Sequence, residues 1–273
     1  MLILRLRTQP PARLAADALT PERVDGLAPS EVAALTLRCG REKLAVGDVF
    51  DVSGEDVQQV AFAGDLCRVD GIGAGMSRGQ LLVEGPCGDH LGARMRGGEI
   101  AVRGDVGSWA GGEMSGGLLR IWGAAGARLG GAYPGARAGM TGGEIIVAGD
   151  AGEEAGAGMR RGLVVVSGRT GSGAGLRMLA GTLIALRGIG AEAGLGNRRG
   201  TLVSGTPVEP LPSYAFAARY RPPALRLQLR RARDLWLRVD DALVNGTWAR
   251  WSGDRTELGR GEILMFDEEE LAG

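Results

Sequence analysis

The segment GARMRGGEIAVRGDVG at residues 92–107 is one copy of a motif that recurs seven times between Gly71 and Gly205. Its methionine recurs at Met76, Met95, Met114, Met140, Met159 and Met178, and Asn197 stands in the seventh place. Successive copies are 19, 19, 26, 19, 19 and 19 residues apart, and a glycine follows three residues after each of these positions. A period this strict indicates a repeat architecture.

Apolar side chains recur in two columns of each copy. The residues five and seven positions after the methionine are Leu81 and Val83 in the first copy and Ile100 and Val102 in the second. Alternation of this kind indicates a strand with both columns facing inward. Because 19 residues are too few for a strand and a helix, successive strands must pair in parallel, and parallel crossovers are right-handed. We predict an all-β chain, a right-handed parallel β-helix (solenoid) of about seven 19-residue coils.

The flanks of the array differ from it in pattern. Residues 1–70 contain short alternating runs that predict N-terminal strands and an irregular cap coil. Residues 71–205 form the β-helix repeats, and residues 206–273 form a C-terminal extension that begins with Pro207, Pro210 and Pro212. Within the extension, apolar residues from Leu225 to Trp236 fall at helical spacing, which predicts a short helix that packs on the solenoid or on a partner.

Composition and charge exclude several classes of protein. The chain has 32 basic and 32 acidic residues, so it lacks the positive field of a nucleic-acid-binding protein. It has no apolar run of about 18 residues, which predicts no membrane span, and its N-terminus is too charged for a secretory signal. Cys39, Cys67 and Cys87 form no CxxC motif, and an odd number argues against a disulfide framework. We expect a cytoplasmic protein.

An outward column six residues after each methionine changes character along the array. It begins with Leu82, Ala101 and Arg120 and then becomes fully apolar. The apolar members, which form a stripe, are Ile146, Val165, Ile184 and Val203. Such a stripe is usually covered. We expect either residues 206–266 or a partner chain to cover it, and these four residues are candidate partner contacts.

The longer gap between Met114 and Met140 contains an insertion, residues 131–139. An insertion in a stack of repeats must leave the stack, and this one carries Tyr133, Pro134 and Arg137. These three residues are candidate contacts with a partner. The alternative is a neutral surface excursion.

Residues with the potential for chemistry are better explained by structure. The methionines form a core ladder, and the glycine motifs occur at every corner rather than once between a strand and a helix. His90 is the only histidine and lies in an outward column, so no histidine triad or polyhistidine metal site is available. Cys87 lies in a column of small residues, which favours a buried position over a nucleophile.

Whether the paired charged residues have a function stays open from the sequence. Glu99 and Glu144 occupy equivalent outward positions, but a surface carboxylate pair alone does not make an acid and a base. The arginine pairs at residues 160–161 and 198–199 are expected at solvated corners, where they could also meet acidic groups on a partner or an anionic ligand.

The repeat GxxMxGGxIxVxGDxG, seen at residues 92–107 and again at 139–152, resembles the C subunit of formylmethanofuran dehydrogenase and of the related formyltransferase/hydrolase complex. The inserted Ala132–Gly135 and the ending Gly253-Asp254 followed by residues 259–264 are similar as well. The same β-helix forms the C-terminal domain of the large subunit of glutamate synthase. The resemblance covers residues 25–266, and the insertion favours the C subunit.

This resemblance implies a non-catalytic structural subunit of a complex that acts on formyl groups carried by methanofuran-type and tetrahydromethanopterin-type C1 carriers. It implies no cofactor in this chain and no catalytic residue or metal site. The implied partners are an amidohydrolase-like catalytic subunit that carries the metal, a formyltransferase subunit and a dehydrogenase-like B subunit. The arginine-, alanine- and glycine-rich composition favours the formyltransferase/hydrolase complex of aerobic one-carbon metabolism (methylotrophy).

Two alternatives remain open at this point. One is a stand-alone β-helix enzyme with its site in the groove, and the other is a protein related to the glutamate synthase C-terminal domain. The lack of a convergent acidic cluster and the apolar outward stripe favour a structural subunit.

Overall fold

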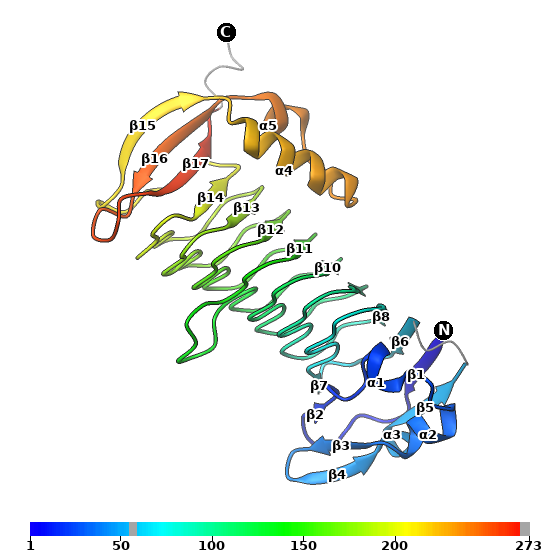
Figure 1. Ribbon diagram of the computed structural model, residues 1–273. Helices are drawn as coiled ribbons and strands as arrows, with labels where there is room; N and C mark the ends of the chain where they lie inside the picture. Colours follow the sequence, from blue (N-terminus) through cyan, green and yellow to red (C-terminus); the bar gives the residue numbers. More distant parts are fainter. Residues whose placement is uncertain (55–58, 268–273) are drawn as a thin grey trace.

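The computed structural model describes residues 1–54 and 59–267. The chain is rich in strands and poor in helices, as the sequence predicts. Most strands join one 13-stranded sheet whose central part is parallel, and four short strands form a second sheet at the N-terminal end (Figure 1).

The repeats supply the central strands of the large sheet, one from each. They are β8 (Gln80–Glu84), β9 (Glu99–Val102), β10 (Leu118–Ile121), β11 (Glu144–Val147), β12 (Leu163–Val166), β13 (Thr182–Ala185) and β14 (Thr201–Ser204). Neighbours are parallel and equivalent positions face each other, so Leu81 pairs with Ile100 and Leu119 with Ile145. The insertion between β10 and β11 therefore leaves the register unchanged, and the repeats stack in one direction (Figure 1).

A second contact joins adjacent repeats away from the strands. It consists of single parallel bridges that run Leu66, Cys87, Val106, Ala125, Ala151 and Thr170. Each of the first five repeats thus has one regular strand and, at this second contact, a single bridged residue and no second strand. The reason lies in the glycine that follows each bridge: at Gly107, a Cβ atom would lie 2.7 Å from the carbonyl carbon of Gly88. The backbones approach closely there, and the chain then turns away.

The interior of the stack is filled by the predicted columns. All six methionines of the repeats are fully buried, as are the columns five and seven residues after them from Ile100 onward. A further apolar column, fifteen residues after each methionine and beginning with Leu91 and Ala110, is buried as well. Asn197, which replaces the seventh methionine, is fully buried, and its side-chain amide bonds both the N–H and the carbonyl of Gly200. The polar residue ends the methionine column with its hydrogen bonds satisfied.

The N-terminal residues extend the same sheet. Strands β1 (Leu2–Leu6), β5 (Phe50–Ser53) and β6 (Gln59–Ala63) lie at one end of it, and β6 is parallel to β8. The sheet thus crosses the boundary expected at residue 70. The smaller sheet contains β2 (Leu14–Ala15), β3 (Thr36–Cys39), β4 (Glu42–Ala45) and β7 (Val69–Asp70), and the short helices nearby are α1 (Pro21–Val24), α2 (Pro29–Ala34) and α3 (Val46–Val49).

The C-terminal residues extend the sheet at its other end and then cover part of it. The elements are β15 (Ala215–Tyr220), α4 (Pro223–Asp234), α5 (Asp241–Asn245), β16 (Trp248–Gly253) and β17 (Gly261–Phe266). Strand β17 is parallel to β14, whereas β16 and β15 are antiparallel additions. Leu225, Leu229 and Ala232 share the buried face of α4, at the helical spacing that the sequence indicates.

This extension occupies the outward apolar stripe. Ile146, Val165, Ile184 and Val203 are fully buried in a second core cluster, separate from the interior of the stack. The cluster is completed by residues of α4, α5, β16 and β17 and of the segments between them. Of the two covers considered from the sequence, the structure contains the one supplied by the chain itself. The four stripe residues therefore lie beneath the chain's own extension and are not exposed for direct contact with a partner.

Among the described residues, no helix has the length and apolar character needed to cross a bilayer.

Candidate functional site

One edge of the stack is built from the turns that precede each methionine. Three alternate residues of such a turn have a left-handed backbone, for example His90, Gly92 and Arg94 with φ of 64°, 58° and 56°. Trp109 and Arg128 occupy the position of His90 in the next two repeats and have φ of 64° and 59°. A left-handed conformation costs a residue with a side chain about 1–2 kcal/mol. The turns tolerate this cost because each is hydrogen-bonded to the next, as from the His90 N–H to the Ser108 carbonyl at 2.8 Å.

The insertion returns to this edge through Tyr133. The Tyr133 ring stacks on Trp109, with centroids 4.5 Å apart and planes 13° apart, and its hydroxyl lies 2.8 Å from Nδ1 of His90. The Arg94 guanidinium lies 5.3 Å from the Tyr133 ring centre, and that of Arg128 lies 4.8 Å from the Trp109 ring. Burial raises the pKa of the Tyr133 phenol above its ordinary value. Tyr133 is therefore neutral at physiological pH and is an anchor for the inserted loop.

This cluster locates one residue named from the sequence and corrects the expectation for another. The sequence groups Tyr133 with Pro134 and Arg137 as partner contacts, but its side chain is half-buried and turned toward the repeats, whereas Pro134 and Arg137 are exposed. The sequence also predicts a surface position for His90, which is instead half-buried against Tyr133. The missed members are Trp109, Arg94 and Arg128. The signal for them was an aromatic residue next to His90 in the same column, close to an insertion that itself carries one aromatic residue.

A shallow hollow of about 630 Å³ lies beside the exposed tip of the inserted loop. Its charged lining includes Arg137, Arg177 and Arg198, and also Glu257, which pairs with Arg198 at 3.0 Å. A second hollow of about 780 Å³ adjoins the first, because both are lined by Leu179 and Arg198. This second hollow contains both arginine pairs, residues 160–161 and 198–199, together with the exposed Leu258.

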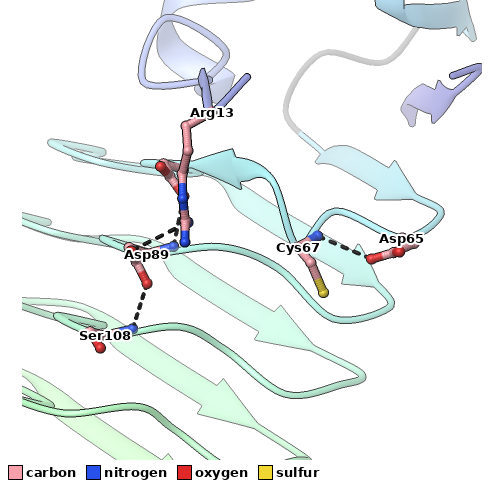
Figure 2. A network of polar contacts seen from close by, with 6 residues as sticks. Arg13, Asp65, Cys67, Asp89 and Ser108 are labelled. Carbon is pink, nitrogen blue, oxygen red and sulfur yellow. Dashed lines mark hydrogen bonds and ion pairs between the residues drawn. The ribbon is translucent and has the colours of Figure 1, made fainter. Parts of the chain in front are cut away.

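On the other side of Tyr133, a hollow of about 790 Å³ faces the N-terminal part of the chain. Arg13 binds two aspartates there, Asp70 at 2.7 Å and Asp89 at 3.3 Å. Each aspartate also accepts a backbone N–H from the next repeat. The Asp89 N–H donates to Asp70 at 2.9 Å, and the Ser108 N–H donates to Asp89 at 2.8 Å, the latter bond being drawn in Figure 2. These carboxylates hold the stack together, and Arg13 ties the N-terminal part to its first repeats.

The cysteines lack the features of a nucleophile. Burial raises the pKa of the Cys87 thiol to about 12, in keeping with the structural role predicted for it. The pKa of Cys67 is raised by a hydrogen bond with Asp65, whose Oδ1 also accepts the Cys67 N–H at 3.1 Å (Figure 2). Nucleophilic cysteines have the opposite shift, toward the thiolate.

The candidate acid and base residues are also engaged in structure. Glu99 pairs with Arg120, and Glu144 binds Arg231 through both carboxylate oxygens at 2.8 and 3.1 Å. Within residues 1–54 and 59–267, no three histidine, cysteine, aspartate or glutamate side chains gather as a metal site would require. The arrangement is suited to binding through arginines and an exposed loop.

Comparison with known proteins finds similarity to a curated protein and to a solved structure. No protein-family model matches the chain. Over 88 residues it is 36% identical to the C subunit of the formyltransferase/hydrolase complex Fhc of Methylorubrum extorquens, and the aligned segment spans 32% of this chain and 33% of that relative. A chain in the crystal structure of the formyltransferase/hydrolase complex FhcABCD from the same organism, solved with methylofuran, superposes with a TM-score of 0.89 and 35% identity. That superposition covers 96% of this chain and 98% of the other.

Proposed function

The chain belongs to the family of the C subunit of the formyltransferase/hydrolase complex, and from this premise we propose that it is a non-catalytic structural subunit of such a complex. The observation that carries the proposal is the likeness over almost the full length of both chains, at 35% identity. Similarity confined to the repeats would support only a shared repeat architecture. Here the N-terminal and C-terminal parts are covered as well, so the parts that determine what the stack can contact are also alike.

The geometry of the site supports the same function. Its carboxylates bind arginines and backbone groups, and its thiols have raised pKa values. The proposed complex handles formyl groups on methanofuran-type and tetrahydromethanopterin-type carriers. We place the carrier and the catalytic metal on the partner subunits, namely an amidohydrolase-like subunit, a formyltransferase subunit and a dehydrogenase-like B subunit, and we place the assembly in the cytoplasm.

We further propose that the stacked repeats are seven coils of a right-handed parallel β-helix. Two features support this: the parallel strands in constant register and the second ladder of single bridges. A scaffold of this kind is rigid along its axis, because each repeat is hydrogen-bonded to its neighbour at both places. It could therefore hold partner subunits at fixed separations.

A comparison of the chain alone with the assembled complex tests the proposal. The chain is produced alone and together with the other three subunits of the complex from the same source, and assembly and formyl transfer are measured. We expect a stable assembly that depends on this chain and no formyl transfer or hydrolysis by the chain alone. Hydrolysis of formyl-methylofuran by the isolated chain would contradict a structural role.

The inserted loop offers a finer test, because its anchor and its tip can be separated. Arg137→Ala changes the exposed tip and is expected to weaken assembly while leaving the melting temperature of the isolated chain unchanged. Tyr133→Ala removes the stack on Trp109, which is worth about 0.5–1.5 kcal/mol beyond burial, so it should lower both stability and assembly. Equal effects of the two substitutions on stability would contradict the distinction between anchor and tip.

A further inference from the structure

The two adjoining hollows beside the inserted loop concentrate positive charge in a chain whose net charge is zero. Seven arginines line them, against Glu154 and Glu257. These two glutamates pair with Arg128 and Arg198 at 2.8 and 3.0 Å. The remaining five arginines have no ion pair in the described part of the chain; they are Arg137, Arg160, Arg161, Arg177 and Arg199.

The backbone holds these arginines in a fixed pattern. Arg160, Leu179 and Arg198 are equivalent residues of three successive repeats, and each donates its N–H to the methionine carbonyl of the preceding repeat at 2.7–2.9 Å. Successive repeats are separated by about 4.8 Å, so the two arginine pairs lie roughly 10 Å apart with Leu179 between them. Like charges at this spacing would repel in the free chain. This repulsion is relieved when a surface of opposite charge faces the arginines.

The apolar residues among the arginines indicate what kind of partner fits. Leu258 is 53% exposed and Leu179 lies between the arginine pairs, so apolar surface is interspersed with guanidinium groups. Arginine combined with exposed apolar side chains is typical of protein interfaces. A small anion would instead need donors that converge on one point, whereas these arginines are spread over several repeats. Guanidinium groups pair with carboxylates in a bidentate geometry.

We propose that this arginine face, defined by Arg137, Arg160, Arg161, Arg177 and Arg199, docks a partner subunit through a surface of aspartate and glutamate side chains around an apolar centre. The inference rests on the proposed function and adds the face and the chemistry of the contact. The exposed tip of the inserted loop lies at the rim of the same hollow, so it belongs to one continuous contact surface with the arginines.

The test compares two double variants with equal changes of charge. Arg160→Glu with Arg199→Glu alters the arginine face, while Arg41→Glu with Arg103→Glu alters exposed arginines elsewhere that lack ion pairs among the described residues. Each is assembled with the other subunits, and the dissociation constant is measured at 50, 150 and 400 mM NaCl. We expect at least tenfold weaker assembly for the first variant only, and a weaker dependence on salt. Arg160→Gln with Arg199→Gln replaces the first variant if melting of the isolated chain indicates misfolding.

The outcomes separate this inference from the function on which it rests. Assembly of the wild-type chain with an unaffected arginine-face variant would overturn the docking face alone. Failure of the wild-type chain to assemble would overturn both. The alternative is that the arginine face binds a small anion, which is tested by titrating the isolated chain with citrate. If the arginine-face variant no longer binds citrate but assembles as well as the wild type, the face is a small-anion site and the inference is wrong.

Discussion

The outward column of the large sheet has a covered half and an open half. In the covered half, Ile146, Val165, Ile184 and Val203 are fully buried beneath the C-terminal extension. In the open half, Leu82, Ala101 and Arg120 are only partly buried, and Arg120 pairs with Glu99 on the same surface. The strand register is continuous across both halves. The backbone is therefore the same in both halves. The two halves differ in the outward column, where the side chains are all apolar only in the repeats that the C-terminal extension covers.

The border between the halves lies where α4 and the residues just after it end. Gln228 donates to the Thr182 hydroxyl of β13 at 3.0 Å, and Arg231 binds Glu144 of β11. Beyond the helix, Trp236 stacks on Trp122, which follows β10, with centroids 4.5 Å apart. The C-terminal extension, which covers the apolar stripe, thus runs back along the stack and ends beside β10. The column changes from Ile146 to Arg120 at that place.

The largest expected effect comes from placing the same charge in each half. Val165→Asp puts a carboxylate in a fully buried apolar cluster, where it has no partner, and should destabilise the fold by more than about 4 kcal/mol. Ala101→Asp makes the same change of charge on the open half and should cost about 0.5 kcal/mol or less. Urea unfolding measures both. Similar losses for the two variants would show that the halves do not differ as described.

A second comparison uses two leucines of α4 that differ in burial. Leu229 is fully buried against the stripe, whereas Leu227 is 66% exposed. Leu229→Ala should cost about 2–5 kcal/mol, because it removes buried methyl groups and leaves a cavity. Leu227→Ala, the matched control, should change stability by about 0.5 kcal/mol or less. Thermal denaturation of both variants checks the orientation of the helix, and a larger loss for Leu227→Ala would contradict it.

The attachment of the cover to the last repeat depends on Asp254, which is fully buried. Its carboxylate accepts the N–H groups of Gly196 and Thr256 at 3.1 and 2.9 Å and the Thr256 hydroxyl at 2.7 Å. Burial acts to raise the pKa of Asp254, but these hydrogen bonds outweigh it and the pKa is lowered. A lowered pKa means that the stabilisation is complete above the ordinary value of about 3.9 and is lost as the pH falls below it.

Asp254→Asn should therefore cost about 1–3 kcal/mol near neutral pH, and the difference from the wild type should shrink below about pH 4. Urea unfolding at pH 7 and pH 3.5 measures both quantities. Glu209→Gln, at an exposed position, is the control and should differ little from the wild type at either pH. A loss for Asp254→Asn that is equal at both pH values would refute the role of the ionised carboxylate.

The smallest effect is expected at the border itself. Arg231 is 49% exposed, so its ion pair with Glu144 is largely screened by solvent. Arg231→Met keeps much of the side-chain volume and should cost less than about 1 kcal/mol. Arg226→Met, at an exposed position of the same helix, is the comparison for loss of charge without loss of this pair. A cost above about 2 kcal/mol for Arg231→Met would mean that the ion pair, rather than the apolar cluster, holds the cover.

Periodic features were predictable from the sequence because the repeats impose them. The methionine ladder, the two inward columns and the helix near Leu225 follow from residue spacing alone, and the structure has all of them. The apolar stripe could be recognised as covered for a similar reason, since it breaks the expected alternation. The pairing of β6 with β8 was less visible because β6 lies before the first copy, in a segment that lacks the methionine and the glycine of the motif.

The candidate site was predicted only in part, because its contacts depend on where an aperiodic segment lies. The sequence indicates that residues 131–139 leave the stack, but it does not indicate that Tyr133 returns to Trp109 and His90. The repeat relates His90 to Trp109, but no period relates Tyr133 to either of them. The sequence predicted that the two arginine pairs lie at solvated corners of the repeats. It did not predict that they lie close to Arg137 and Arg177, in two adjoining hollows.

The course of α4 along the stack makes the helix a ruler for the number of repeats. A helix rises about 1.5 Å per residue and each parallel strand adds about 4.8 Å, so about three helical residues correspond to one repeat. Gln228 and Arg231 of α4 and Trp236 just beyond it meet partners on three different repeats. The partners of Gln228 and Arg231 are two repeats apart although these residues are only three apart, so their long side chains span the remaining distance. Inserting a 19-residue repeat between β11 and β13 would thus require a lengthening of α4 by about three residues to keep all three contacts.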